Sequence, residues 1–376
     1  MKKKVLVWLS GWVDSAVSAA LLLEQWYEVV WWFMKNYVSD KWNCTTFKDA
    51  EEAIKVAKFL WIELLSFDLQ KEYQERIIDY IFEWYSKWIT PNPDVLCNNL
   101  IKFDVFLNKA MEQWFDYIAT GHYARIKASL KKPHPIPLLI GEGNREAEGE
   151  VDGQIQYHLL QWVDSWKDQS YFLSGLNQYQ LSKSIFPLGE MTKQQVREKA
   201  KEIWLPNAER KDSQGLCFIW NVPIRTFLMQ KFPKKEWDIL DLNWKKVWTH
   251  QWAYFYTIGQ KQWLWLNFKA YVYRIDIENN ILYVTDKDAE ELKTKTLIAK
   301  NWHWICPDME SEILNWKKNL TGKIRYRQIP AVECDLEKME NWDVKVIFEK
   351  EQRAVAPGQV FVAYDWDECL GNGMIA

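Results

Sequence analysis

Cys97 stands in a setting that could support nucleophilic chemistry. It closes the segment TPNPDVLCN (residues 90–98), in which two prolines impose an extended, rigid approach. Asp94 precedes the thiol by three residues, so one helical turn could present both side chains, and a carboxylate there could accept or donate a proton. The alternative is a buried structural cysteine that follows a proline turn.

Cys217 is the second candidate nucleophile. It ends a polar, glycine-containing stretch, KDSQGLCFI (residues 211–219), where backbone amides and a lysine could hold the sulfur as a thiolate. The alternative is a small apolar filler. The other cysteines (44, 306, 334 and 369) are expected to be structural. The histidines at 134, 158, 250 and 303 show no metal-ligand spacing, and no metal site is predicted.

A third constellation could bind phosphate. The segment LSGWVDS (residues 9–15) lies between an apolar run, 5–9, and a helical pattern, 15–25. Backbone N–H groups and the helix dipole at such a junction form an anion cradle. The segment matches neither a Walker A loop nor GxGxxG. The alternative is an ordinary capped helix start.

The elements around these segments alternate between strand and helix. Strands are expected at 5–9, 28–34, 62–67 and 117–120, and helices at 15–25, 51–60 and 190–203. This alternation predicts an α/β domain with a doubly wound parallel sheet. Ligands of such sheets bind at the carboxyl ends of the strands, where Ser10, Lys35 and Gly121 fall.

The second half of the chain has a different residue pattern. Residues 127–155 are Lys/Pro-rich and then Gly/Glu-rich, which predicts a solvated insertion. Short strands expected at 281–285, 323–327, 344–348 and 360–364 predict a small all-β barrel. The expected domains are 1–208 for nucleotide binding, a small central domain at 209–276 with Cys217, and the barrel at 277–376.

One of the barrel strands is unusually basic. Lys323, Arg325 and Arg327 would alternate along the expected strand and project from one face. That face could simply be solvated, or it could contact RNA phosphates.

The composition is that of a globular protein. The chain has 376 residues, 48% of them hydrophobic, and a formal net charge of −3, so any RNA-binding surface must be a local patch. The basic residues 2–4 precede an apolar run too short for a signal peptide or a membrane span. A cytoplasmic protein with no membrane partner is expected.

Tryptophan is abnormally abundant. The chain has 25 Trp and only 14 Gly, whereas glycine usually makes up about 7% of residues. Trp26 and Trp204 follow helical patterns where a C′ glycine belongs, and Trp244 follows Asn243 where a hairpin glycine belongs. Either the protein is genuinely Trp-rich, or its source reads UGA as glycine and many of these residues are glycine in the cell.

Taken together, these segments resemble the bacterial tRNA-specific 2-thiouridylase family, whose members use a pyrophosphate loop to bind ATP. The resemblance spans nearly the whole chain and rests on residues 10–15, 33–36, 90–98, 121–125, 167–172, 212–219, 254–261, 325–328 and 356–359. The departures are tryptophans where the family pattern has glycine, at positions 12, 88, 220, 263, 265 and 366, and a longer insertion.

The resemblance implies a role for each matched position. The ATP site would comprise Trp8, Leu9, Ser10, Gly11, Trp12, Val13, Asp14, Ser15, Met34 and Gly121. Asn92, Pro93 and Asp94 would face the target base, and Asp94 would assist proton transfer. The residues contacting tRNA would be His122, Lys167, Asp168, Gln169, Arg325, Tyr326 and Gln359.

The implied activity is ATP-dependent 2-thiolation of the wobble uridine of a tRNA. ATP is a substrate, with Mg²⁺ on its phosphates, and there is no permanently bound cofactor. Cys217 would receive sulfur as a persulfide from a donor protein, and Cys97 would be its partner nucleophile. The uridine would have to flip out of its loop.

Two other readings compete with the sulfurtransferase. An amide-forming ligase with the same kind of ATP loop would need neither the cysteine pair nor a basic β-rich tail. A catalytically impaired tRNA-binding protein would follow if Trp12 is genuine, because an indole would fill the space where backbone must approach pyrophosphate.

Overall fold

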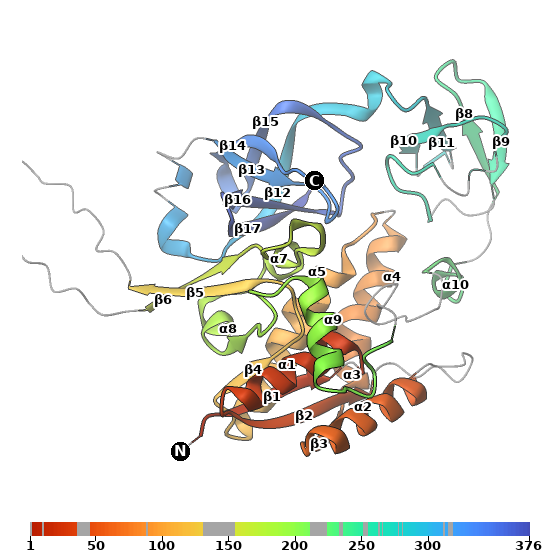
Figure 1. Cartoon of the computed structure of the whole chain (residues 1–376). Helices are drawn as coiled ribbons and strands as arrows, with labels where there is room; N and C mark the ends of the chain where they lie inside the picture. The colour runs from red at the N-terminus through yellow and green to blue at the C-terminus, as the bar shows by residue number, and fades with distance from the viewer. Residues whose placement is uncertain are drawn as a thin grey trace, which may run out of the picture.

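A computed structural model describes most of the chain (Figure 1). The described residues are 2–9, 11–35, 46–87, 89–130, 155–210, 224–232, 236–250, 255–261, 264, 266–276, 278–279, 281–310, 313–314 and 319–376. Ser10 and Cys217 lie outside them, and so do the tryptophans at 88, 220, 263 and 265. No helix within the described part is both long and apolar enough to cross a membrane.

The N-terminal domain contains a five-stranded sheet in the order β3-β2-β1-β4-β7. Its strands are β1 Lys4–Leu9, β2 Glu28–Lys35, β3 Glu63–Asp68, β4 Tyr117–Ala119 and β7 Ser184–Ile185. Every pairing in this sheet is parallel. The strand order reverses between β1 and β4, which is where open α/β sheets bind their ligands. The predicted doubly wound sheet is confirmed.

Helices cover both faces of this sheet because its central strand is apolar on both sides. In β1, Leu6 and Trp8 belong to one buried cluster, whereas Val5, Val7 and Leu9 belong to the other. The cluster with Val5, Val7 and Leu9 packs under α1 (Val13–Glu24), α2 (Thr46–Leu60) and α9 (Lys193–Glu202). The cluster with Leu6 and Trp8 packs under α3 (Gln70–Tyr73), α4 (Asp79–Ser86), α5 (Pro93–Cys97) and α6 (Leu107–Glu112). Two π-helical segments, Gln74–Ile78 and Asn98–Phe106, connect these helices.

The central domain follows the short helix α10 (Ile224–Leu228). It contains a four-stranded sheet in the order β10-β11-β8-β9, formed by Tyr271–Asp276, Ile281–Thr285, Trp237–Leu240 and Lys246–His250. Its strands enclose a small core of their own around Ile239, Val272 and Leu282. In Figure 1 this domain lies to one side of the barrel, above α10.

The C-terminal strands close into the predicted barrel, but the strand expected at 281–285 is not part of it, because it pairs in the central sheet as β11. The barrel strands are β12 Lys293–Trp304, β13 Leu320–Lys323, β14 Val332–Lys338, β15 Val344–Arg353, β16 Val360–Asp365 and β17 Glu368–Ile375. Their order is β12-β15-β14-β13-β16-β17, and pairing of β12 with β17 completes the ring. Closure leaves no unpaired sheet edge within the ring.

A two-stranded ribbon joins the α/β domain to this barrel. The ribbon is β5 (Arg125–Leu130) with β6 (Ile155–Leu160), and β6 pairs with β17 through Leu159 opposite Cys369. In Figure 1 it runs beneath the barrel and beside α7 (Ser170–Leu173) and α8 (Gln178–Ser182). The predicted solvated insertion at 127–155 is therefore wrong at its two ends, because residues 127–130 and 155 are strand.

The basic strand predicted at 323–327 is also wrong. Strand β13 ends at Lys323, and residues 324–327 form a turn in which the Gln328 side chain accepts a hydrogen bond from the Ile324 N–H (2.9 Å). Lys323 is buried and pairs with Asp168 (Nζ to Oδ2, 3.3 Å), whereas Arg325 is exposed. The basic residues therefore do not share one strand face.

Seven tryptophans adopt the left-handed backbone that favours glycine. They are Trp26, Trp61, Trp114, Trp204, Trp244, Trp342 and Trp366, with φ between 54° and 65°. The first four directly follow or lie just beyond α1, α2, α6 and α9, where paired backbone bonds of the Schellman type end each helix. All seven side chains are exposed. Trp26, Trp204 and Trp244 thus occupy the glycine-type turns that the sequence predicted.

Candidate active site

The phosphate-loop segment has the predicted strand–loop–helix geometry. Strand β1 ends at Leu9 and helix α1 begins at Val13, so the first N–H groups of α1 point toward the carboxyl edge of the sheet. Gly11 has a φ of 74°, whereas Trp12 is extended with φ −91° and ψ 161°. The backbone at Trp12 is therefore unstrained, so its side chain adds only bulk, and Gly11 takes the left-handed conformation.

Gly121 brings a second backbone segment against this loop. It follows β4, and a Cβ on it would lie 3.0 Å from both the carbonyl carbon of Asp14 and the N of Ser15. These neighbours are backbone atoms, so a side chain here would have to displace the first turn of α1. Gly121 thus sets the width of the predicted nucleotide site.

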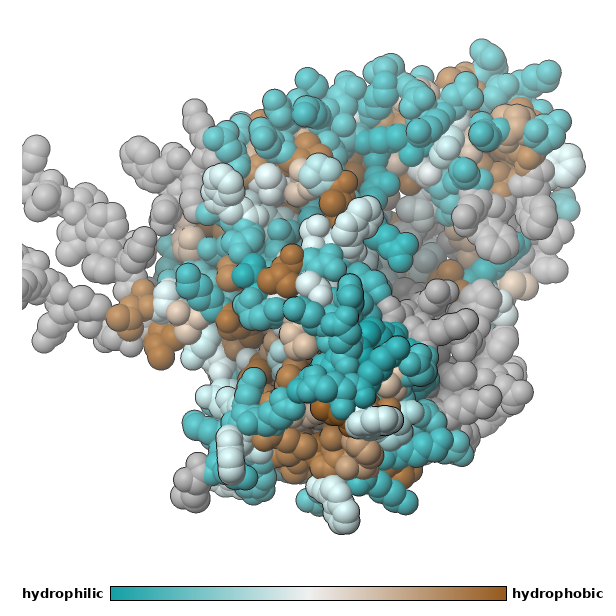
Figure 2. Space-filling view, viewed as in Figure 1, coloured by the Kyte–Doolittle hydropathy of each residue, from teal (hydrophilic) through white to brown (hydrophobic). Residues whose placement is uncertain are grey.

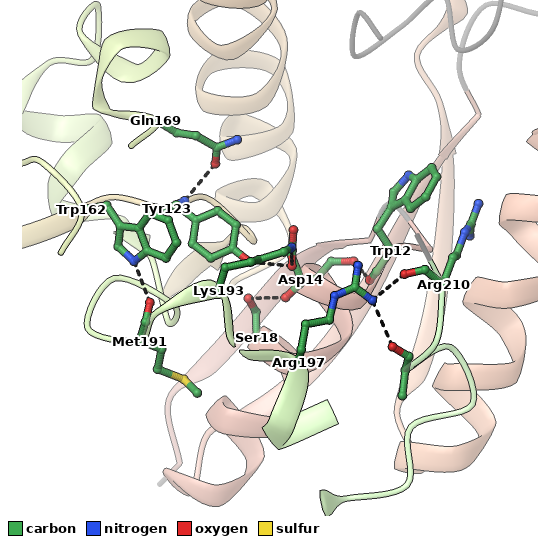
Figure 3. Close-up of polar contacts among 12 residues, drawn as sticks. Trp12, Asp14, Ser18, Tyr123, Trp162, Gln169, Met191, Lys193, Arg197 and Arg210 are labelled. Carbon is green, nitrogen blue, oxygen red and sulfur yellow. Dashed lines mark hydrogen bonds and ion pairs between the residues drawn. The ribbon is translucent and has the colours of Figure 1, made fainter. Parts of the chain in front are cut away.

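Helix α9 supplies a cation to the same place (Figure 3). Asp14 accepts hydrogen bonds at Oδ1 from Tyr123 Oη and from Lys193 Nζ, both at 2.6 Å. Lys193 Nζ also contacts Tyr123 Oη at 3.1 Å. Lys193 is the first residue of α9, and the space-filling view shows hydrophilic side chains covering this helix (Figure 2). The sequence marked 190–203 only as a helix and missed this lysine.

Two arginines lie on the other side of the loop. Arg210 donates to the Gly11 carbonyl (2.9 Å), and its guanidinium lies 3.8 Å from the centre of the Trp12 ring. Arg197 in turn donates to the carbonyls of Ala208 and Arg210 (Figure 3). With Lys193, which is paired with Asp14, three cationic side chains lie near the loop. That is the electrostatic setting a polyphosphate requires.

The segment 90–98 forms the start of a helix, as predicted. Asn92 caps α5 by accepting from the Val95 N–H (3.3 Å), and Pro93 occupies the first helical position. Asp94 and Cys97 therefore share one turn, with Cys97 buried. Its predicted partner Cys217 lies outside the described residues, so their proximity stays a prediction.

All three domains meet at the start of this segment. Gln359 of the barrel donates its side-chain amide to the Thr90 carbonyl (2.8 Å). Thr257 of the central domain hydrogen-bonds the Thr90 hydroxyl (2.7 Å). Gly358 has a φ of 82°, and a Cβ there would lie 2.1 Å from a methyl group of Ile89. The barrel thus holds the backbone that leads to Asp94 and Cys97. Gln359, which the resemblance assigned to tRNA contact, bonds the Thr90 carbonyl of that backbone.

An aromatic wall stands beside Asp94. Tyr326 packs on Phe172 with ring centres 4.3 Å apart, and Tyr171 lies 6.3 Å from Tyr326. Burial, together with the nearby carboxylates of Asp168 and Asp94, raises the pKa of Tyr326 to about 12. The Tyr326 hydroxyl therefore stays protonated at neutral pH and can donate a hydrogen bond.

Comparison with known proteins matches the whole chain. Family profiles described as a tRNA methyl transferase HUP domain, a tRNA methyl transferase PRC-barrel domain and an aminomethyltransferase beta-barrel domain match residues 3–221, 225–286 and 294–375. The tRNA-specific 2-thiouridylase MnmA of Methylobacillus flagellatus is 39% identical over 100% of this chain and 99% of its own. The chain belongs to the tRNA-specific 2-thiouridylase family.

Further relatives carry the same description. The tRNA-specific 2-thiouridylase MnmA 1 of Geobacillus kaustophilus is 40% identical over 100% of this chain and 95% of its own. The Christiangramia forsetii protein is 39% identical over the full length of both chains. The first matched range, 3–221, extends past the expected boundary at 208 and includes Cys217.

The residues that the 2-thiouridylase resemblance assigned to tRNA contact fall into two groups. Lys167 and Arg325 are exposed and can meet a phosphate directly. Asp168 is buried, where it accepts from Ser170 and the Trp162 N–H and pairs with Lys323. Gln169 exchanges two hydrogen bonds with the Tyr123 backbone (2.9 and 2.8 Å). The side chains of Asp168 and Gln169 therefore bond to neighbouring protein groups and hold the backbone beside Lys167 in place.

His122 belongs to the interior as well. It is buried beside Phe103 and Phe186, with Thr120 Oγ1 at 2.7 Å and Lys102 Nζ at 3.5 Å. Burial, with the nearby charge of Lys102, holds the pKa of His122 well below its usual value, so the ring is neutral. Lys102 follows Cys97 on the same continuous helical stretch, and no local sequence signal marked it.

Proposed function

We propose that this protein is an ATP-dependent tRNA sulfurtransferase that replaces the 2-oxygen of the wobble uridine with sulfur. The proposal rests on similarity along the whole chain to proteins described as tRNA-specific 2-thiouridylases. The location of Asp94 and Cys97 on one turn, at the meeting point of three domains, agrees with it. The alternative of a catalytically impaired tRNA-binding protein finds no support in these comparisons.

The first step activates the base. A uridine carbonyl resists substitution because its oxygen leaves poorly. The O2 atom of the base attacks the α-phosphorus of ATP, pyrophosphate departs, and the base carries AMP on that oxygen. Gly11 and the first N–H groups of α1 would cradle the phosphates, and the positive charges of Lys193, Arg197 and Arg210 would offset the negative charge.

The second step delivers sulfur. The terminal sulfur of a Cys217 persulfide attacks C2, and AMP leaves with the original oxygen. Cys97 then attacks the sulfur of Cys217, so that the thiouridine sulfur departs and a Cys97–Cys217 disulfide remains. An external thiol reductant restores both thiols. A persulfide-bearing donor protein supplies the sulfur, and Asp94 exchanges protons with the base or with Cys97.

The flipped base would enter beside the aromatic wall. Tyr326 and Phe172 offer faces for stacking, and the protonated Tyr326 hydroxyl offers a donor. Asn92, Pro93 and Asp94 lie at the start of α5, on the segment that the barrel holds. Exposed Lys167 and Arg325 would bind the flanking phosphates.

Mg²⁺ would arrive with the nucleotide. Asp14 is the carboxylate of the loop itself, and its Oδ1 already accepts from Tyr123 and Lys193. That donor set does not fit a dedicated magnesium site, which prefers oxygen ligands and keeps several waters.

The proposal is tested with purified protein, unmodified tRNA, ATP and a persulfide-loaded donor. We expect 2-thiouridine in the digested tRNA, with one AMP and one pyrophosphate released per sulfur inserted. Omission of ATP should leave the uridine unmodified. Release of AMP without thiolated tRNA, or thiolation without ATP, would contradict the proposed reaction.

A further inference from the structure

Away from the phosphate loop and α5, the structure brings together three side chains of the kinds that bind zinc. They are His158, Cys306 and Glu368, and one ligand atom from each lies within 4.8 Å of the others. His158 comes from the ribbon strand β6, Glu368 is the first residue of the barrel strand β17, and Cys306 follows the end of β12. The cluster therefore lies on the seam between the α/β domain and the barrel.

We propose that His158, Cys306 and Glu368 bind a Zn²⁺ ion that fastens the β5–β6 ribbon to the barrel. One thiolate, one imidazole and one carboxylate are the three ligand types that zinc accepts in proteins. Calcium and magnesium prefer oxygen ligands alone. A thiolate and a carboxylate also carry the two negative charges that neutralise a dication in a partly buried place.

Small shifts of the three side chains would bring their ligand atoms to the distances of a zinc site. Zinc bonds of about 2.0–2.3 Å in a tetrahedron place ligand atoms about 3.3–3.8 Å apart. His158 Nδ1 and Glu368 Oε1 are 2.7 Å apart in a hydrogen bond, which the ion would replace by opening this contact slightly. The sulfur of Cys306 would then move about 1 Å toward the pair.

The surroundings orient two of the three ligands. His158 Nε2 is hydrogen-bonded to Ser129 Oγ at 2.7 Å, which leaves Nδ1 for the metal. Gln178 donates its side-chain amide to the sulfur of Cys306 at 3.1 Å and is itself held by the carbonyls of Tyr157 and Ile305. Such outer hydrogen bonds fix the orientation of the ligands. Burial raises the pKa of the Cys306 thiol to about 11, so binding of the ion would release the thiol proton.

The fourth position is open to water. The side chains of His158 and Glu368 are 16% and 19% exposed. A water molecule can therefore complete the tetrahedron. The neighbouring Arg125–Asp367 ion pair (2.7 Å) crosses the same seam, so the ion would strengthen a contact that already exists.

Cobalt(II) substitution tests the site in the full-length protein. The parent for this experiment carries Cys97→Ala and Cys217→Ala, so that neither predicted active-site thiol can bind the probe. We expect one equivalent of Co²⁺ to give thiolate-to-metal charge-transfer absorption and the intense visible bands of a tetrahedral ion, and Zn²⁺ to abolish both. Zn²⁺ should also raise the melting temperature by several degrees.

Variants decide which residues are responsible. Adding Cys306→Ala should abolish the charge-transfer band and the zinc-dependent shift, whereas Cys334→Ala, at a buried cysteine in the barrel, should retain both. Glu368→Gln keeps the side-chain volume and should weaken cobalt binding at least about tenfold, because an anionic ligand is lost. If Cys306→Ala does not fold, Glu368→Gln and His158→Gln carry the decision. No cobalt spectrum in the parent, or an unchanged spectrum in these variants, would overturn the proposal.

Discussion

The proposed catalytic edge of the α/β domain and the turn of the barrel at residues 324–328 are built in opposite ways. At the proposed catalytic edge (residues 11–15, 90–98 and 121), groups are partly or fully buried and backbone packs against backbone; a Cβ on Gly121 would lie only 3.0 Å from the backbone of α1. In the barrel turn (residues 324–328), Arg325 is exposed and donates to the carbonyls of Arg353 and Ala354. We therefore expect single changes to be decisive at the edge and graded in the turn.

The largest effect is expected from the two predicted nucleophiles. Cys217→Ser should lower thiolation at least about a thousandfold and leave tRNA binding nearly intact, because a hydroxyl cannot carry a persulfide although it is close in size. Cys97→Ser should also stop turnover while sulfur accumulates on Cys217. Nucleoside analysis measures the first effect, and persulfide labelling measures the second.

Cys334→Ser is the matched control, because Cys334 lies in the barrel core. It should change stability and leave sulfur transfer per folded molecule unaltered. Normal 2-thiouridine from the Cys217→Ser protein would show that Cys217 does not carry the sulfur.

A large effect is also expected at Trp12. Its backbone is unstrained, so an indole there acts through volume beside the phosphates. Protein made with the printed sequence should be poorly active or poorly soluble, and Trp12→Gly should improve ATP binding without restoring full activity. Isotope-exchange or equilibrium ATP-binding measurements report the change.

Native material provides the independent check on Trp12. If UGA is read as glycine, the peptide spanning residues 8–12 should show glycine at position 12, and the protein should weigh well under 45.1 kDa. Tryptophan at position 12 in that peptide would refute the reassignment.

The left-handed tryptophans should give moderate, additive effects on stability. Changing Trp26, Trp61, Trp114 or Trp204 to Gly should each stabilise the α/β domain by about 1 kcal/mol, because only glycine adopts that backbone without strain. Trp248→Gly is the control: this exposed residue lies in β9, where glycine should destabilise. Chemical denaturation measures both, and stabilisation by Trp248→Gly would show that removal of an exposed indole alone suffices.

The smallest effect is expected from the barrel turn. Arg325→Ala should weaken tRNA binding and flatten the log–log dependence on salt by about 0.7–0.9 units, as loss of one phosphate contact requires. ATP affinity should not change, because Arg325 lies apart from the phosphate loop. Binding isotherms at several salt concentrations give the slope, and an unchanged slope would mean that this turn only faces solvent.

The sequence alone determined the features that local backbone rules control. The period of the apolar residues predicted β1 and α1, the alternation of strands and helices predicted the parallel sheet, and the three-residue spacing in TPNPDVLCN predicted that one turn carries Asp94 and Cys97. Tryptophans after helical patterns predicted left-handed turns that the structure contains. Each of these depends on residues only a few positions apart, whose hydrogen bonds and sterics are written in the local sequence.

Only the tertiary structure decided which distant residues meet. Lys193 reaches Asp14 across 179 positions, and His158 reaches Glu368 across 210, although neither pair has a sequence spacing that suggests contact. Packing also overruled a local pattern at Lys323, which turns inward to the buried Asp168. Contacts of this kind depend on how strands close into a barrel and how that barrel docks, and the free energy of burial selects them over the whole chain rather than within one segment.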